Sequence, residues 1–229
     1  MENVKILNEK LIINENNKYD MIIFDVDGTL CDTVDILYDS INCILEKNSI
    51  NKRVNIEDIK SGQGLNRENF AKKCLYFLEK DVREKILVEA DKLKYNKINN
   101  SSIKIYNKVK DTIEELSKKY LITIVSNCGR GYIETIIPKI GISNYITDYI
   151  AASAFNISKA DAIKEIIRRN NAKNAIYVGD TLLDRNSSIE AGVDFIFASY
   201  GFGKNVNSKY KINDFSELIY KIKKIENEM

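Results

Sequence analysis

The stretch YDMIIFDVDGTLCDT, residues 19–33, decides the fold of this 229-residue chain. Four apolar residues, Met21–Phe24, are followed at once by two acids, Asp25 and Asp27, and then by a glycine and a threonine. An uninterrupted apolar run of this length is typical of a strand that is buried on both faces of a parallel sheet. In open α/β sheets, binding sites form outside the carboxyl ends of the strands. The stretch therefore predicts a buried strand that delivers two carboxylates to a functional site.

Composition limits the kind of protein and the kind of chemistry. Apolar residues make up 44% of the chain, which is enough for a sizeable core. The formal net charge is only +2 and the lysines are scattered, so binding to nucleic acid is not expected. The chain contains no histidine, which rules out catalytic triads and metal sites that use imidazole. Acid–base chemistry must therefore come from Asp, Glu, Lys, Cys or Tyr.

The pattern of apolar residues does not indicate a membrane protein. No apolar run approaches the roughly 18 residues that a membrane-spanning helix needs, and residues 1–17 lack the layout of a signal peptide. The four cysteines form no C-x-x-C pair, so reduced thiols are expected. We therefore expect a cytoplasmic protein with no membrane partner. Within the first 17 residues, Val4, Ile6, Leu11 and Ile13 are compatible with a short edge hairpin.

Strand-like and helix-like segments alternate along most of the chain. Besides Met21–Phe24, short apolar runs predict strands at Leu121–Val125, Tyr149–Ala152, Ala175–Val178 and Phe195–Ala198. Apolar residues at helical spacing predict helices over Asn107–Lys119, Ser158–Asn170 and Asp214–Glu226. This order predicts an α/β fold with a doubly wound, mostly parallel sheet.

Residues 32–105 interrupt the alternation, because they show helical periodicity and no convincing strand. We therefore expect an α/β core made of residues 1–31 and 106–229, with an inserted helical cap of residues 32–105. Long connections in such folds are uncommon and are often functional, so a lid over an active site is the favoured interpretation. A purely structural helical appendage is the alternative.

Polar groups follow four of the predicted strands, beginning with the two acids of the opening stretch. Ser126 and Asn127 follow the second strand, Lys159 opens the helix after the third, and Asp180 and Asp184 follow the fourth. Each residue alone would be read as an ordinary turn, cap or surface residue. Because the carboxyl ends of parallel strands meet at one edge of the sheet, the combination predicts a single polar site.

The chemistry of these groups suits phosphoryl transfer. Carboxylate oxygens are the ligands that Mg²⁺ prefers, and a carboxylate can also be a nucleophile that forms an aspartyl-phosphate. Hydroxyl, amide and ammonium groups offset the negative charge that develops on a transferred phosphoryl group. Gly28 lets the chain turn tightly beside the first two acids. The residues therefore favour a magnesium-dependent enzyme that acts on a phosphorylated compound.

Four segments resemble, in order, the motifs of the haloacid dehalogenase-like hydrolase superfamily. They are DVDGTL at Asp25, VSNCGR at Ser126, NISKADAI at Lys159, and VGDTLLD at Asp180 and Asp184. The resemblance extends from about residue 19 to about residue 203. The position and helical character of the insertion resemble the small cap of the phosphoglycolate phosphatase and β-phosphoglucomutase branch.

The resemblance implies a role for each acid. Asp25 would be the nucleophile that attacks phosphorus, and Asp27 would protonate the leaving group and then deprotonate the hydrolytic water. The metal would be Mg²⁺, held by the Asp25 carboxylate, the backbone carbonyl of Asp27 and the Asp180 carboxylate. Asp184 would support the metal or its waters from nearby.

The resemblance also implies groups that bind the phosphate and the rest of the substrate. Ser126 and Lys159 would hold the phosphoryl oxygens, Lys159 would neutralise Asp25, and Asn127 would add a donor. In the cap, GLNRENF resembles a loop that contacts the substrate, so Arg67 is the candidate for specificity, with Gly62 and Gly64 providing loop freedom. An ordinary turn with a surface arginine is the alternative. The segment SYGFG, residues 199–203, resembles a glycine-rich loop near the site, although a simple turn explains it equally well.

The resulting prediction is a Mg²⁺-dependent phosphatase that hydrolyses a small phosphomonoester through an aspartyl-phosphate. A phosphomutase of the β-phosphoglucomutase type would need the same residues and remains an alternative. An alternative from another class is a phospho-accepting receiver, or a binding protein without turnover. The expected partner is a small phosphorylated metabolite. Sugar phosphates, phosphoglycolate, nucleotides and pyrophosphate remain open, as does a monomer or a homodimer.

Overall fold

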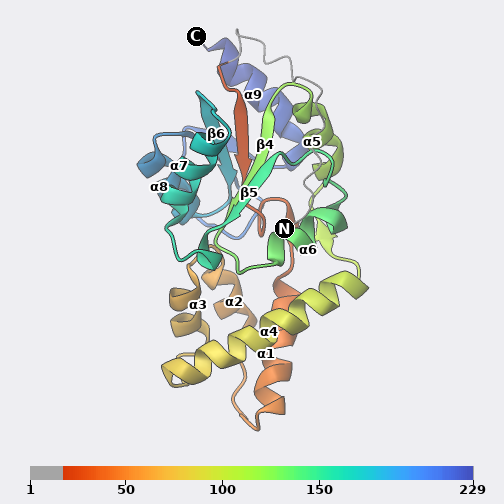
Figure 1. Ribbon diagram of the computed structural model, residues 1–229, viewed down its shortest axis with the longest axis vertical. Helices are drawn as coiled ribbons and strands as arrows, with labels where there is room; N and C mark the ends of the chain where they lie inside the picture. The colour runs from red at the N-terminus through yellow and green to blue at the C-terminus, as the bar shows by residue number, and fades with distance from the viewer. Residues whose placement is uncertain (1–17, 229) are drawn as a thin grey trace.

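A six-stranded parallel sheet forms the centre of the molecule (Figure 1). The computed structural model describes residues 18–228, so the hairpin expected in residues 1–17 lies outside the described residues. The strand order is β5-β4-β1-β6-β7-β8, and each neighbouring pair is parallel. The strands are β1 (Met21–Phe24), β4 (Leu121–Ser126), β5 (Asp148–Ala151), β6 (Ala175–Gly179), β7 (Asp194–Ala198) and β8 (Tyr210–Ile212). The predicted α/β class and all five predicted strands are confirmed; β8 was not predicted.

Helices cover both faces of the sheet, which explains why the central strand β1 is apolar and buried along its whole length. On one face, α7 (Lys159–Arg169) and α8 (Leu182–Ala191) lie over the strands (Figure 1). On the other face are α5 (Val109–Ser117), α6 (Tyr132–Ile140) and α9 (Leu218–Asn227). Each face has its own cluster of buried apolar side chains. The described core also contains two short 3₁₀ turns, η1 (Ala152–Ala154) and η2 (Phe215–Glu217), the second of which begins the predicted helix at Asp214–Glu226.

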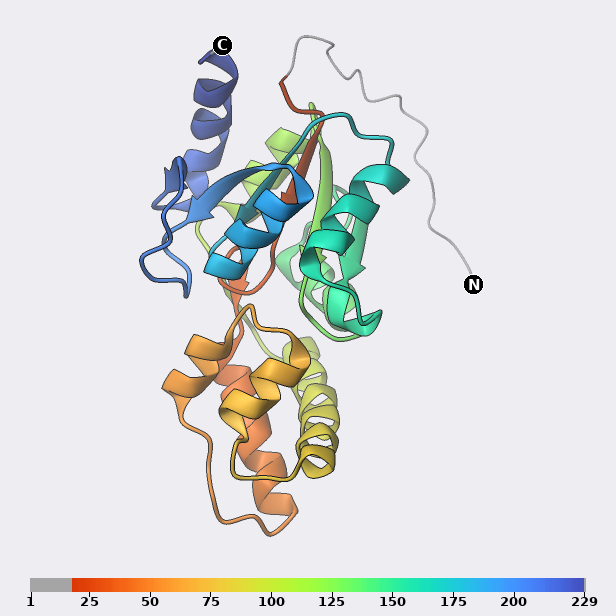
Figure 2. The same cartoon turned by 90° about the vertical axis from the view of Figure 1, so that its left-hand side faces the viewer.

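Four helices between the short strands β2 (Cys31–Asp32) and β3 (Lys104–Ile105) form a separate helical body, called the cap below, which lies beyond one end of the core (Figure 2). They are α1 (Val34–Lys47), α2 (Ile56–Gly62), α3 (Arg67–Cys74) and α4 (Lys80–Asn100). The cap has an apolar cluster of its own, which includes Ile41, Leu45, Ile59, Leu75 and Ala90. Although α4 has 21 residues, no helix within residues 18–228 is both long enough and apolar enough to cross a membrane.

A short antiparallel ribbon connects the cap to the core. It consists of β2 (Cys31–Asp32) and β3 (Lys104–Ile105), and Lys104 Nζ lies 2.9 Å from Asp32 Oδ2. The ribbon coincides with the ends of the insertion expected at residues 32 and 105. The division of the chain into domains at these positions remains a prediction.

Candidate active site

The strand β1 places Asp25 at the point where the strand order of the sheet reverses. The strands β4 and β5 extend the sheet on one side of β1, whereas β6, β7 and β8 extend it on the other. The Asp25 backbone N–H donates to the Val178 carbonyl at 3.0 Å, so the β1–β6 ladder continues up to the acid. Such reversal points are where open α/β sheets bind ligands.

The turn after Asp25 depends on Gly28. This glycine has φ +88°, a left-handed conformation that residues with a Cβ rarely adopt. A Cβ at this position would also overlap the Asp180 carboxylate, so the turn and the β6 exit approach each other closely. Backbone hydrogen bonds from Leu30 to Val26 and from Gly28 to Cys31, both 2.8 Å, close the turn. The glycine of the opening stretch therefore brings two strand exits together.

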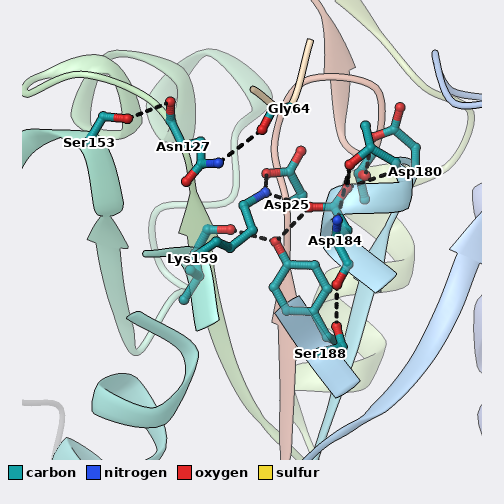
Figure 3. Close-up of polar contacts among 12 residues, drawn as sticks. Asp25, Gly64, Asn127, Ser153, Lys159, Asp180, Asp184 and Ser188 are labelled. Carbon is teal, nitrogen blue, oxygen red and sulfur yellow. Dashed lines mark hydrogen bonds and ion pairs between the residues drawn. The ribbon is translucent and has the colours of Figure 1, made fainter. Parts of the chain in front are cut away.

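Three buried carboxylates from these exits form one acidic cluster. One oxygen each of Asp25, Asp180 and Asp184 lie within 4.8 Å of one another (Figure 3). Burial raises the pKa of Asp25 to about 6, with the nearby Asp184 charge adding to the rise and Lys159 opposing it. Burial, followed by the charges of Asp184 and Asp25, holds the pKa of Asp180 well above its usual range. The cluster therefore contains more negative charge than its protein surroundings neutralise.

Lys159 provides the one ammonium that reaches this cluster within the described chain. Its Nζ lies 2.9 Å from Asp25 Oδ1 and 2.5 Å from Asp184 Oδ1, and the side chain is almost fully buried (Figure 3). Burial disfavours the charged form, but the charges of Asp184 and Asp25 outweigh it and raise the lysine pKa. Ser158 caps α7 and accepts the Asp161 N–H at 3.0 Å, which fixes Lys159 as the first residue of the helix. The predicted pairing of Lys159 with Asp25 is present in the geometry.

Asp184 is held by the first turn of α8. Its Oδ2 accepts the backbone N–H of Thr181 at 2.8 Å and the Thr181 hydroxyl at 2.6 Å, in a capping box. Since Oδ1 is bound to Lys159, both oxygens of Asp184 already have protein partners. Asp184 thus orients Lys159 in addition to contributing charge to the cluster.

Asp180 is contacted by the glycine-rich segment at residues 199–203. The Phe202 N–H donates to Asp180 Oδ2 at 2.7 Å, and a Cβ at Gly201 would overlap both Asp180 and the Gly28 carbonyl. The segment therefore lies beside the site, as its resemblance to a glycine-rich loop implied. The close packing explains why glycine is needed there.

Asp27 lies in different surroundings, although it is only two residues from Asp25. Its Oδ1 accepts hydroxyl hydrogen bonds from Thr33 and Tyr132, both at 2.7 Å. Its Oδ2 lies 3.9 Å from Lys94 Nζ of the cap. The two acids therefore have separate partners, as separate roles require.

The acidic cluster fits a divalent cation that prefers oxygen ligands. Within residues 18–228, Asp25 Oδ2 takes part in no ion pair or hydrogen bond, and Asp180 Oδ1 has only a weak contact with Thr29 at 3.4 Å. Buried carboxylates in excess of the nearby positive charge are costly unless a cation compensates them. The donors are all hard oxygens, with no sulfur or imidazole among them, which is the set that suits Mg²⁺.

A cavity lies between the acidic cluster and the cap. Its core side is formed by Asp25, Asp27, Ser126 and Asn127, and its cap side includes residues 62–65 and 67. Asn127 Nδ2 donates to the Gly64 carbonyl at 2.9 Å, so this amide contacts the cap directly (Figure 3). The predicted phosphate-binding residues and the predicted specificity loop thus face the same space. Their roles remain predictions.

The cap residues singled out from the sequence occupy three distinct positions. Gly62 is the last residue of α2 and packs against Phe70 rather than belonging to a free loop. Gly64 has φ +80° and approaches Thr181 of the core. Arg67 begins α3 and lines the cavity, where its guanidinium is bound by Glu84 at 2.8 Å and by Asp91 at 2.5 Å. The charge of Arg67 is therefore already matched by carboxylates of the cap.

Three residues around Asp27 were missed from the sequence: Thr33, Tyr132 and Lys94. Tyr132 begins α6, a helix that was not predicted. Its side chain is buried, and its hydroxyl donates to Asp27 Oδ1 and lies 2.9 Å from the Thr33 hydroxyl. No local pattern distinguishes it from the other tyrosines of the chain. Lys94 did carry a signal, because it stands on the apolar face of α4, at helical spacing from Ala90 and Ile98. A lysine at such a position is a candidate for a buried function.

Comparisons with known proteins agree with the fold and with the order of the motifs. A model of the haloacid dehalogenase-like hydrolase family matches residues 22–198. A phosphoglycolate phosphatase of Psychrobacter arcticus is 22% identical over 87% of this chain and 94% of its own length. A phosphoglycolate phosphatase of Haemophilus influenzae is 21% identical over 89% of this chain and 98% of its own length.

Solved structures share the same overall fold. A protein described as a predicted phosphoglycolate phosphatase from Haemophilus somnus superposes with a TM-score of 0.79, at 19% identity over 89% of this chain and 98% of its own. A β-phosphoglucomutase from Clostridium difficile superposes with a TM-score of 0.75, at 16% identity over 91% of this chain and 97% of its own. The expectations of family and of an enzyme are confirmed: the chain belongs to the haloacid dehalogenase-like hydrolases.

Proposed function

We propose that the protein is a Mg²⁺-dependent phosphatase that hydrolyses a small phosphomonoester through an aspartyl-phosphate on Asp25. The observation that carries the proposal is the contrast between the two acids of the opening stretch. Asp25 is paired with the Lys159 ammonium inside an acidic cluster, whereas Asp27 is held by two hydroxyls at the same cavity. One carboxylate is thus kept ionised for attack, and the other is positioned to move protons.

In the first step, Asp25 attacks phosphorus while the bond from phosphorus to the leaving oxygen breaks. The ammonium of Lys159 favours the charged form of the Asp25 carboxylate and can donate a hydrogen bond to the phosphoryl oxygens. Ser126 and Asn127, which line the same wall of the cavity, are the further donors proposed for these oxygens. Positioning and charge stabilisation of this kind account for most of the catalysis in phosphoryl transfer.

Asp27 moves the protons in both steps. It gives a proton to the leaving oxygen in the first step and takes one from the attacking water in the second. The water then displaces Asp25 from phosphorus, which releases phosphate and restores the free carboxylate. The hydroxyls of Thr33 and Tyr132 fix Asp27 Oδ1, so Oδ2 is the oxygen that remains to carry the proton.

The proposed ligands of Mg²⁺ are the carboxylates of Asp25 and Asp180 and the backbone carbonyl of Asp27, with Asp184 nearby. When bound, the ion supplies positive charge that neutralises the substrate phosphate and the acidic cluster. Protein contacts also position the acids, through Lys159, the Phe202 N–H and the α8 capping box.

The size of the cavity supports a small substrate. Its volume is about 110 Å³, far below the roughly 300–1,000 Å³ of pockets that enclose drug-sized ligands. Two relatives named phosphoglycolate phosphatase match almost the whole chain, and phosphoglycolate is an ester of suitable size. Belonging to a hydrolase family also disfavours the alternative of a phospho-accepting receiver.

The test is phosphate release from a panel of small esters, measured with Mg²⁺ and with EDTA. We expect release that requires Mg²⁺ and that falls more than about 1,000-fold in Asp25→Asn, because an amide is a poor nucleophile. Asp39→Asn, an exposed acid on α1, is the matched control and should behave as wild type. Undiminished release by Asp25→Asn would overturn the mechanism. Phosphate transfer between sugar positions without net release would identify a mutase instead.

A further inference from the structure

Lys94 of the cap is buried where an apolar residue would be expected. It lies on the face of α4 that packs against the rest of the molecule, together with Ile86, Leu87, Ala90 and Ile98. Only 6% of Lys94 is exposed, although lysine is among the residues least often buried. Burying an ammonium is costly unless partners compensate it. The position of Lys94 therefore calls for a functional explanation.

The partners of Lys94 within the protein are incomplete. Its Nζ lies 4.0 Å from the centre of the Tyr132 ring, in a cation–π contact, and 3.9 Å from Asp27 Oδ2. The latter distance is too long for a hydrogen bond. An ammonium has three N–H donors, and Lys94 donates none of them to a residue in the part of the chain that the structure describes. The group faces the cavity with its donors unused.

The other cations near the cavity are already committed. Arg67 is bound by two cap carboxylates, and Lys159 by two carboxylates of the core. Among the described residues, Lys94 is therefore the cavity cation with charge and donors left for a ligand. It belongs to the cap, whereas the proposed phosphate site belongs to the core.

We infer that Lys94 binds a second anionic group of the substrate, a carboxylate, while the core holds the phosphate. This inference rests on the proposed function and assigns it a substrate class: small phosphate esters of hydroxy acids. Because Lys94 lies so close to Asp27, the carboxylate must be only a few atoms away from the phosphate. The cavity that Lys94 lines has a volume of about 110 Å³, which suits a carboxylate better than a nucleotide. Lys94 then takes the role that the sequence suggested for Arg67.

The competing explanation is that Lys94 only positions Asp27. The two explanations predict different effects of a Lys94 substitution on different esters. A residue that positions Asp27 affects esters with similar leaving groups alike, since each needs the same proton transfers. A residue that binds the substrate carboxylate affects only esters that have one. A pair of esters that differ in this group separates the two explanations.

The experiment compares phosphoglycolate with 2-hydroxyethyl phosphate, in which a CH₂OH group replaces the carboxylate. We expect wild type to prefer phosphoglycolate in kcat/KM, and Lys94→Met to reduce that preference by about 10- to 100-fold, mainly through KM. Lys92→Met is the matched control, because Lys92 is an exposed lysine on the same helix, and it should keep the wild-type preference. No preference in wild type, or equal losses on both esters in Lys94→Met, would overturn the inference.

A binding measurement keeps this test independent of turnover. Calorimetric titration of phosphoglycolate into Asp25→Asn, with and without Lys94→Met, should show binding weakened by about 10- to 100-fold in the double variant. If wild type releases no phosphate but this difference appears, the proposed function fails while the role of Lys94 stands. If release is observed but the difference is missing, the role of Lys94 fails alone. Thermal unfolding checks each variant, and Lys94→Gln replaces Lys94→Met if the latter does not fold.

Discussion

Asp25 and Asp27 are two residues apart, yet their surroundings differ, and this difference supports the separate roles proposed for them. Asp25 is bound to an ammonium and lies among other carboxylates, whereas Asp27 is bound to hydroxyls. Different surroundings give two neighbouring acids different properties, as the proposed roles of nucleophile and proton carrier require. The division depends on residues outside the opening stretch, above all on Tyr132.

Tyr132→Phe is expected to lower kcat by about 10- to 100-fold, because one hydrogen bond to a charged acceptor contributes roughly 1.5–3 kcal/mol. The hydroxyl of Thr33 remains on Asp27 Oδ1, so orientation is weakened rather than lost. The loss should be larger for alkyl phosphates than for p-nitrophenyl phosphate, because a poor leaving group depends more on protonation. Steady-state rates on the two esters provide the measurement.

The control for this variant is Tyr120→Phe, which removes a hydroxyl bonded to Glu226 of α9 from a similarly buried tyrosine. Its rates on both esters should match wild type. Equal losses on the alkyl and nitrophenyl esters in Tyr132→Phe would show that the hydroxyl does not act through Asp27.

At the scale of helices and strands, the N-cap of α7, Ser158, stands next to the proposed catalytic residue Lys159. Ser158→Ala should destabilise the protein by about 1 kcal/mol, the usual cost of losing a helix N-cap. For a chain of this size that corresponds to a fall in Tm of about 2–4 °C. Because Lys159 is the next residue, kcat should fall as well. Thermal unfolding and phosphate release measure the two effects.

Asn55→Ala separates the loss of stability from the loss of kcat. Asn55 is the N-cap residue of α2, and no proposed catalytic residue stands beside it. Its Tm should fall by a similar amount while kcat stays at the wild-type value. A Ser158→Ala protein with lowered Tm and normal kcat would show that capping of α7 does not position Lys159.

The elements that sequence could predict are those whose signal is local. The apolar runs of β1, β4, β6 and β7 were recognised because nearly every residue of these strands is buried, and β5 was recognised although its Tyr149 is 37% exposed. The strand β8 was missed, because its three residues alternate buried, exposed and buried around Lys211. In α4, the apolar residues Val82 and Val88 are each 40% exposed. The face that is buried instead includes Lys94, which no apolar pattern would select.

The same distinction applies to the site. Asp25, Asp180 and Lys159 could be identified because a strand and its turn place each of them at the edge of the sheet. Tyr132 could not, because its position comes from packing of α4 against α6, two helices separated in sequence. Lys94 carried only an indirect signal, that of a lysine on the apolar face of a helix. The contacts of Arg67 with Glu84 and Asp91 arise in the same way, from packing of α3 against α4.

At the scale of the whole molecule, the site exists only where cap and core meet. The core supplies the acidic cluster and the proposed phosphate donors, and the cap supplies Lys94 and the Gly64 carbonyl that Asn127 contacts. Most apolar residues of the cap form their own cluster, although Ile98 of α4 packs in the core cluster, and the β2–β3 ribbon connects the two bodies. Such an arrangement allows the cap to move while the acids of the core stay in place.

If the proposed Mg²⁺ binds the acidic cluster, it should also raise the stability of the whole fold. Three buried carboxylates with one ammonium repel one another, and a cation that binds only the folded state removes this cost. At a Mg²⁺ concentration of 100 times its Kd, the free energy of unfolding should rise by about 2.7 kcal/mol. For a chain of this length, Tm should then be about 5–10 °C higher in Mg²⁺ than in EDTA. Thermal unfolding at matched ionic strength measures the shift.

Asp180→Asn tests whether that shift comes from the cluster. The amide oxygen can still accept the Phe202 N–H, but one of the three buried negative charges is gone. In EDTA the variant should be at least as stable as wild type, because the repulsion that raises the pKa of Asp180 is relieved. With Mg²⁺ the variant should gain little, because a ligand has been lost. A Mg²⁺ shift as large as that of wild type would place the stabilising ion away from Asp180. A variant that is less stable than wild type in EDTA would show that the three carboxylates are not in conflict.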